Sequence, residues 1–79
     1  MNKKIYNEVM SGKSDNNIKF NDFRNLIVDL GFTFTRQSGS HVQYYHSEIN
    51  ERMTIQNANS KANGYQVRQL RNIIIKHGL

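Results

Sequence analysis

The stretch Phe32–His46, FTFTRQSGSHVQYYH, decides the fold, because it has the pattern of two short strands joined by a turn. Side chains in a strand alternate between the two faces of a sheet, so an inner, apolar face and an outer, polar face can be assigned. The inner face takes Phe32, Phe34, Arg36, Val42 and Tyr44. The outer face takes Thr33, Thr35, Gln37, His41, Gln43 and Tyr45. Ser38-Gly39 makes the turn, since glycine tolerates a positive φ.

His41 is the one plausible general acid or base in the sequence, because the alternation places it on the exposed face of the hairpin. It lies just past the turn on the outer face of the hairpin, with arginine, serine, glutamine and tyrosine nearby. An exposed imidazole gives or takes a proton near neutral pH. In RNA cleavage, such a group would deprotonate the ribose 2′-hydroxyl or protonate the leaving oxygen. The alternative is that His41 is an ordinary polar residue of a solvated strand.

The distribution of charge points to a polyanionic partner. The chain has 79 residues, which fits one small domain, and a formal net charge of +5. No acidic residue lies between Asp29 and Glu48, and none follows Glu51. The segment after Glu51 carries the cations Arg52, Lys61, Arg68, Arg71 and Lys76. A basic half of this kind fits nucleic acid first, and a solubilising surface or a contact with an acidic protein is the alternative.

The composition also limits the compartment and the chemistry. The sequence has no cysteine and no apolar run long enough to cross a membrane, and its Lys-rich start lacks the apolar stretch of a signal peptide. We therefore expect a cytoplasmic protein with no membrane partner. His41 and His46 point to opposite faces of one strand, and no carboxylate lies near enough in the sequence to suggest a facial metal site with them. We therefore expect no metal site and no cofactor.

The rest of the chain predicts helices before and after the hairpin. A first helix runs from an Asn2 cap to about Met10, and a polar break over residues 11–17 follows it. A second helix is capped by Asn21 and ended by Gly31. The apolar face of the second helix is made by Phe23, Leu26, Ile27 and Leu30. Aromatic residues expected in the core are Tyr6, Phe20, Phe23, Phe32, Phe34 and Tyr44.

After the hairpin, the pattern predicts one more strand and a last helix. The strand Arg52–Asn57 turns Met53 and Ile55 inward, and a polar loop over Ala58–Gly64 leads to a helix over Tyr65–His77. The core stripe of this helix is made by Val67, Leu70, Ile73 and Ile74. The order α-α-β-β-β-α predicts an α+β fold. In it, a three-stranded antiparallel sheet has helices packed on one face, and its other face is open.

Five further residues are candidates for contacts with RNA. Arg36 lies near the end of its strand, where a long side chain can reach round to the hairpin tip. Gly39 and Ser40 are turn residues, and Ser40 would position the histidine or the substrate. Lys61 precedes the last helix, whose N-terminus attracts phosphate, and Arg68 lies on the non-core side of that helix. The alternative for each is an ordinary solvated turn, strand end or helix face.

Several motifs of the chain stand in one order. They are Gly31-Phe32, then Arg36-Gln37-Ser38-Gly39-Ser40-His41, a polar loop with Lys61, and Tyr65-Gln66-Val67-Arg68-Gln69-Leu70 before a terminal Gly78-Leu79. In this order and spacing, over roughly residues 18–79, the chain resembles the HicA-type toxins. These are the small mRNA interferases of bacterial type II toxin–antitoxin pairs. The Arg-Gln-x-Gly-Ser-His run is the specific part of the resemblance.

The resemblance implies a double-stranded-RNA-binding-domain-like fold and a toxin that cleaves mRNA without a metal or other cofactor. It implies that His41 is catalytic and that a HicB-type antitoxin covers the histidine face. Residues 1–79 would form one HicA-like domain, with residues 1–17 as an N-terminal helical extension. Many members carry a Pro-x-His element on the third strand, where this chain has Gln56-Asn57-Ala58. Catalysis here would then rest on His41 alone, or on Lys61 or Tyr45 as its partner.

Two other functions fit the same residues. One is a non-catalytic RNA-binding module of the same fold, and the other is a protein-interaction domain whose basic face meets an acidic partner. The basic half does not separate the three hypotheses, because all three partners are anionic. Position 41 separates an enzyme from a binding module, because a binder tolerates alanine there and an enzyme does not.

Overall fold

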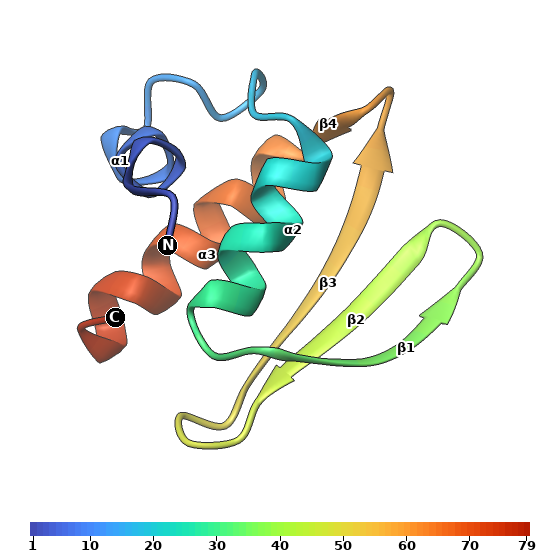
Figure 1. Ribbon diagram of the computed structural model, residues 1–79. Coiled ribbons are helices and arrows are strands. Elements are labelled where there is room, and N and C mark those ends of the chain that lie inside the picture. Colours follow the sequence, from blue (N-terminus) through green and yellow to red (C-terminus); the bar gives the residue numbers. More distant parts are fainter.

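Two helices, α2 (Phe20–Asp29) and α3 (Gly64–His77), cover one face of an antiparallel sheet (Figure 1). A third helix, α1 (Lys3–Ser11), lies across both of them on the side away from the sheet. The sheet contains, in spatial order, β1 (Thr33–Ser38), β2 (His41–His46), β3 (Glu51–Ala58) and β4 (Lys61–Ala62). The computed structural model describes residues 1–79. It confirms the double-stranded-RNA-binding-domain-like α+β fold, with one strand more than the sequence predicted.

The core lies between the inner face of the sheet and helices α2 and α3. The predicted core stripe of α3 is buried throughout. In the predicted core stripe of the second helix, only Leu30, which follows the last residue of α2, is partly exposed. The sheet contributes Val42, Tyr44, Met53 and Ile55, and α1 contributes Ile5 and Val9. The Asn2 side chain accepts a hydrogen bond from the backbone N–H of Ile5, which confirms the predicted cap of α1. None of the three helices is long and apolar enough to cross a membrane.

The fourth strand was missed by the sequence analysis, which placed Lys61 and Ala62 in a loop. Asn57 pairs with Ala62 and Ala58 pairs with Lys61, so β3 and β4 form a short hairpin. Its two turn residues, Asn59 and Ser60, both have positive φ, of 55° and 67°. This is the conformation of a type I′ turn. A strand of two residues shows no alternation of apolar and polar side chains, so its sequence carries no strand signal.

The start of α2 also differs from the prediction. The helix begins at Phe20, so Asn21 lies in its first turn and is not its N-cap; Lys19 holds that position without a side-chain hydrogen bond. The backbone replaces the missing cap, because the N–H of Phe20 donates to the carbonyl of Ser60 over 2.9 Å. The adjoining N–H of Ala62 donates to the carbonyl of Ile18 over 2.8 Å. Pairing with the β4 segment therefore fixes where α2 starts.

A β-bulge at Thr35 changes the faces assigned to the first strand. Phe34 pairs with Tyr44 but Arg36 pairs with Gln43, so Thr35 is an extra residue on β1. The Thr35 hydroxyl donates to the carbonyl of Gln43 over 3.1 Å and holds the bulge. Paired residues share a face, so Arg36 lies on the outer face and Gln37 on the inner one. The sequence analysis had assigned both the other way round.

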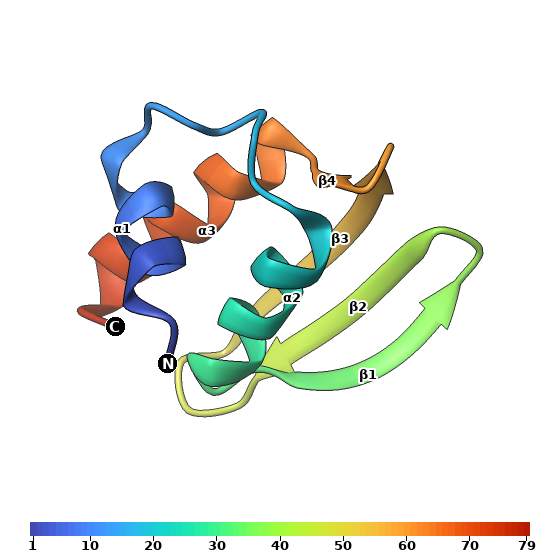
Figure 2. The ribbon, with the colours of Figure 1, turned by 45° about the horizontal axis from the view of Figure 1, so that its top comes forward.

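Phe34 is the predicted core residue that the structure leaves exposed. It lies on the inner face opposite Tyr44, and the two rings meet edge to face with centroids 6.0 Å apart. The side chain is nevertheless 54% exposed. β1 is the outermost strand of the sheet, and the β1–β2 hairpin extends past α2 (Figure 2). No helix therefore covers Phe34, and its face of the strand is apolar without being core.

Gly31 ends α2 and lies close against the buried ring of His46. The N–H of Gly31 donates to Val28 and that of Phe32 to Ile27, which is the Schellman arrangement at a helix end. Gly31 has a φ of +106°, and a Cβ built there would lie 2.6 Å from His46 Nε2. The His46 ring is buried, packs edge to face on Phe32 and lies 3.1 Å from the Leu30 carbonyl. As predicted, His46 and His41 are on opposite faces of β2.

Arg71 ties α1 and the following loop to α3. Its guanidinium donates to both carboxylate oxygens of Asp15, over 2.9 and 3.1 Å, and to the Val9 carbonyl at the end of α1 over 2.9 Å. The side chains of Arg71 and Asp15 are 17% and 13% exposed. These contacts raise the pKa of Arg71, chiefly through the hydrogen bonds with Asp15. Arg71 is therefore a structural residue whose charge is paired within the chain, and it does not add to the free positive charge expected of the basic half.

We expect Arg71→Ala to lower the free energy of unfolding by about 1.5–3 kcal/mol, because it leaves Asp15 and the Val9 carbonyl without their charged donor. Urea denaturation followed by circular dichroism measures this difference. Arg68→Ala is the matched control, since Arg68 is exposed on the same helix, forms no ion pair, and has its guanidinium 5.8 Å from the centroid of the Tyr65 ring. Its expected loss is below about 1 kcal/mol. Equal losses in the two variants would show that the Asp15 contact contributes nothing.

Candidate functional site

His41 begins β2 and lies exposed on the open face of the sheet, as the alternation predicted. It pairs with Ser38 on one side and with Gln56 on the other, so the three residues form a row across the strands. The rings of His46 and His77 are hydrogen-bonded within the chain, and that of His41 is not. The imidazole of His41 is therefore free to meet a ligand with either nitrogen.

Arg36 is brought to this face by the bulge. The next row on the open face, two residues farther along the strands, contains Arg36, Gln43 and Thr54. Arg36 is thus the diagonal neighbour of His41 across the β1–β2 ladder, a relation that places Cα atoms about 7–8 Å apart. Long side chains reach each other across that distance. An imidazole and a guanidinium that share an exposed strand face can contact the same phosphate group.

The hairpin tip leaves its backbone open beside His41. The turn consists of Gly39 and Ser40, one residue later than predicted, because Ser38 is the last residue of β1. Gly39 has a φ of +59°, and a Cβ built there would have no atom within 4 Å. The Gln37 amide donates to the Gly39 carbonyl over 3.1 Å. Gly39 and Ser40 are exposed, so a ligand at His41 has free access to this turn.

Lys61 lies farther along the same face. Its partner Ala58 is two residues beyond Gln56 in β3, so Lys61 faces the side of the sheet that carries His41. The side chain is exposed, and its Nζ lies 3.4 Å from Asn17 Oδ1. Arg68 belongs to a different surface, on α3 beside β3. The structure therefore groups Arg36, the turn and Lys61 around His41 on one face, and it sets Arg68 apart.

The basic half of the chain is less uniform than its sequence suggests. Arg71 is paired with Asp15, and Lys76 lies 3.6 Å from Glu51. Arg52, Lys61 and Arg68 remain without a carboxylate partner. No group of three or more histidine, cysteine, aspartate or glutamate side chains comes together in the structure. The open sheet face thus carries positive charge and hydrogen-bonding groups around one histidine.

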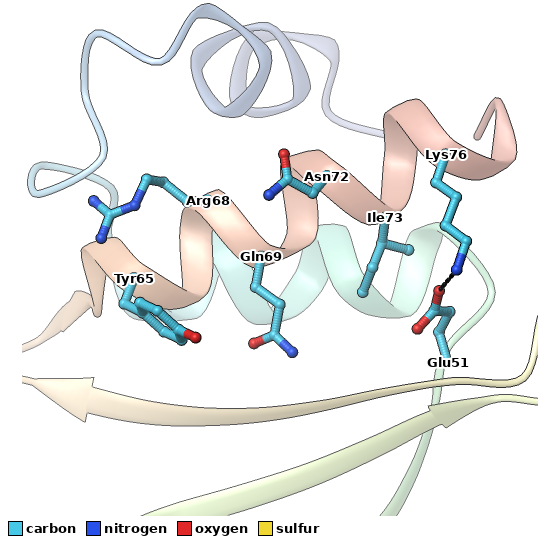
Figure 3. Close-up of a pocket in the computed structure, with 7 residues that line it drawn as sticks. All are labelled: Glu51, Tyr65, Arg68, Gln69, Asn72, Ile73 and Lys76. Atoms are coloured by element: carbon cyan, nitrogen blue, oxygen red, sulfur yellow. Dashed lines mark ion pairs between the residues drawn. The ribbon is translucent and has the colours of Figure 1, made fainter.

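The one pocket of the structure lies away from His41, in a groove between α3 and β3 (Figure 3). Its volume is about 340 Å³. Seven residues line it: Glu51, Tyr65, Arg68, Gln69, Asn72, Ile73 and Lys76. At one end, Glu51 Oε2 lies 2.8 Å from His77 Nε2 and near Lys76. The sequence gave no sign of this groove, because its two walls come from segments that are separate along the chain.

Glu51 makes the stability of the protein depend on pH. The hydrogen bond with His77, helped by the charge of Lys76, lowers the pKa of Glu51 below its ordinary value of 4.5, against the opposing effect of desolvation. A carboxyl whose pKa is lower in the folded chain stabilises it above pH 4.5, and this contribution is lost as pH falls through the folded-state pKa. We expect the stability difference between the wild type and Glu51→Gln to shrink below pH 4.5. Urea titrations from pH 6 to pH 3 measure it, and a difference that stays constant would contradict this role of Glu51.

The chain matches a known protein family. Residues 20–79 match the family described as the HicA toxin of bacterial toxin–antitoxin systems. The chain belongs to the HicA toxin family. No curated protein and no solved structure gave a significant match. The match confirms the resemblance noted in the sequence, and membership in the HicA family implies a toxin that has an antitoxin partner of the HicB type.

The matched region of this HicA-family chain contains the whole sheet, α2 and α3, and so every candidate residue of the site. Helix α1 and the loop after it lie outside the match. In the structure, α1 packs on α2 and α3 and is fixed by Arg71, while the Tyr6 hydroxyl donates to the Leu79 carbonyl over 2.8 Å. The additional helix therefore covers the helical layer and leaves the open face of the sheet uncovered.

Proposed function

We propose that this HicA-family toxin is an endoribonuclease that cleaves mRNA in the cytoplasm, with His41 as general acid or base. The observation that carries the proposal is the bulge at Thr35, which turns Arg36 onto the face of the sheet that presents His41. A proton-transfer group and a fixed positive charge then meet at one exposed point. Each of these two components accelerates RNA cleavage by the 2′-hydroxyl.

The reaction requires two proton transfers. The ribose 2′-oxygen attacks phosphorus and loses its proton, while the bond from phosphorus to the 5′-oxygen of the next nucleotide breaks and that oxygen gains a proton. His41 would carry out one of these transfers, and Arg36 would stabilise the negative charge that grows on the phosphate oxygens. The products are a 2′,3′-cyclic phosphate and a 5′-hydroxyl. No metal or other cofactor takes part in this scheme.

The remaining candidates would bind the RNA strand. Lys61 would hold a phosphate on the His41 face, and the open turn at Gly39 would let the RNA backbone approach closely, with Ser40 beside it. Arg68 would contact a phosphate that leaves the sheet toward α3. The HicB-type antitoxin would inhibit the toxin by covering the His41 face.

The imidazole of His41 has no hydrogen-bond partner in the chain, and this favours a second candidate, a non-catalytic RNA-binding module on the same fold. No other side chain orients the imidazole or supplies the second proton transfer within hydrogen-bonding distance. Incubation of the purified chain with a long mRNA in EDTA separates the two candidates. Cleavage supports the nuclease, whereas RNA binding without cleavage would replace it with the binding module.

A further inference from the structure

The outer edge of β3 has no partner strand over most of its length. β2 pairs with one edge of β3 from Glu51 to Gln56, and β4 pairs with the other edge only at Asn57 and Ala58. The backbone N–H of Gln56 points to this outer edge, because it donates to the Gln66 side chain of α3 over 2.9 Å. Residues two apart in a strand direct their backbone groups alike. Thr54 and Arg52 therefore also present their N–H and C=O groups outward.

These outward groups of Arg52 and Thr54 make no hydrogen bond within the chain. An open strand edge of this kind is a template for a further strand. Helix α3 runs beside this open edge of β3, and the groove lies between them. Figure 3 shows the side chains of Tyr65, Gln69 and Ile73 pointing from α3 toward β3 across that groove. Six of the seven residues that line the groove belong to α3, and Glu51, at the start of β3, is the seventh. The groove therefore lies between the helix and the strand, next to the open edge that continues from Glu51 through Arg52 and Thr54.

The charge on the helix side of the groove is positive. Arg68 and Lys76 line it, and no acidic residue lies anywhere in α3. Glu51, the one carboxylate at the groove, is held by His77 and Lys76. A negatively charged ligand would complement this wall. The apolar side chains of such a ligand would pack against Ile73 and the Tyr65 ring.

We propose that this groove binds an extended, acidic segment of a protein partner, which adds to β3 as a strand. A polypeptide fits because its alternating N–H and C=O groups pair with those of Arg52 and Thr54. The RNA backbone offers phosphate acceptors and one ribose 2′-hydroxyl donor per nucleotide, but it lacks the alternation of N–H and C=O groups that matches a strand edge. Residues 51–56 can pair with about five or six residues of the added strand. The groove lies away from His41 and shares only Arg68 with the residues proposed to contact RNA, so the proposal stands independently of the cleavage reaction.

A designed peptide tests the proposal directly. The probe is an eight-residue peptide of alternating glutamate and valine, titrated into the ¹⁵N-labelled full chain and followed by NMR. We expect the amide signals of Arg52 and Thr54 to shift and their hydrogen exchange to slow. The control is the same peptide with every second backbone nitrogen methylated, on the edge that would face β3. This control has no N–H donors on that edge, and it should bind at least about tenfold more weakly than the unmethylated peptide.

Variants of the chain locate the contact. Thr54→Pro removes the outward N–H without touching the β2 ladder, and proline is tolerated where that group faces solvent. We expect it to weaken binding of the glutamate–valine peptide roughly three- to tenfold, while Thr54→Ala, which keeps the N–H, does not. If Thr54→Pro fails to fold, Gln69→Glu and Gln69→Lys form a second pair at an exposed groove position. The glutamate should weaken binding, and the lysine should strengthen it.

Three outcomes would overturn the proposal. The first is that the glutamate–valine peptide leaves the amides of Arg52 and Thr54 unchanged. The second is that its methylated form binds equally well. The third is that a single-stranded RNA oligonucleotide, and not the peptide, protects these amides, which would make the groove part of the RNA surface. Cleavage of mRNA is measured separately, so a failure here leaves the proposed reaction standing.

Discussion

His41→Ala is expected to slow mRNA cleavage by about 10²–10⁴-fold, the contribution that a positioned acid or base makes to a proton transfer. The variant should keep its fold, because an exposed strand residue with no hydrogen-bond partner changes the free energy of unfolding by no more than about 0.5 kcal/mol. Its affinity for RNA should stay close to that of the wild type. Single-turnover cleavage of a labelled transcript in EDTA, with binding measured on the same samples, gives both quantities.

Gln43→Ala is the matched control for this prediction. Gln43 lies on the same strand and the same face as His41, one row away, and it pairs with Arg36. It cannot transfer a proton near neutral pH, so its replacement should change the cleavage rate far less than that of His41. Equal rates for His41→Ala and the wild type would remove His41 from the reaction. Equal losses in the two variants would point to a general disturbance of the face.

Gly31→Ala is expected to lower the free energy of unfolding by about 2–5 kcal/mol. Two effects combine, which are the strain of a side chain at a φ of +106° and the overlap of the new methyl group with the buried His46 ring. Moving that ring breaks its contact with the Leu30 carbonyl and its packing on Phe32. A small domain has only about 5–15 kcal/mol of stability in total, so thermal and urea denaturation should show a large loss.

Gly39→Ala separates the two effects. Gly39 also has a positive φ, of +59°, but a Cβ there meets no atom within 4 Å. This variant therefore carries the backbone strain without the steric overlap, and we expect a loss of about 1–2 kcal/mol. A loss at Gly31 no larger than that at Gly39 would mean that His46 moves aside freely. The contact between Gly31 and His46 would then not hold the end of α2 against β2.

Elements with a long apolar repeat could be predicted from the sequence. The core stripes of α2 and α3, the β1–β2 hairpin, and the inward Met53 and Ile55 of β3 all follow from periodicity. The cap of α1 and the glycine end of α2 follow from local chemistry, since Asn2 and Gly31 act on backbone groups a few residues away. The position of His41 on the open face belongs to this class as well, because it depends on two adjacent strands.

The features that could not be predicted depend on contacts between distant segments. The bulge at Thr35 shifts the register by one residue, and nothing in the residue types of β1 announces it. Phe34 was expected in the core because its strand alternates correctly, but its strand lies at the edge of the sheet. Arg71 meets Asp15 across 56 positions of the chain. Strand β4 and the groove between α3 and β3 could not be predicted for the same reason, because both depend on segments that are apart in the sequence.

The measurement that tests the central claim most directly is the analysis of product ends after cleavage of a long mRNA in EDTA, with the wild type beside His41→Ala. The account predicts fragments with 2′,3′-cyclic phosphate or 3′-phosphate ends and 5′-hydroxyl ends from the wild type, and almost none from the variant. Fragments with 3′-hydroxyl and 5′-phosphate ends would show that water attacked in place of the 2′-hydroxyl. That result, or cleavage that does not depend on His41, would contradict the reaction proposed for the open face of the sheet.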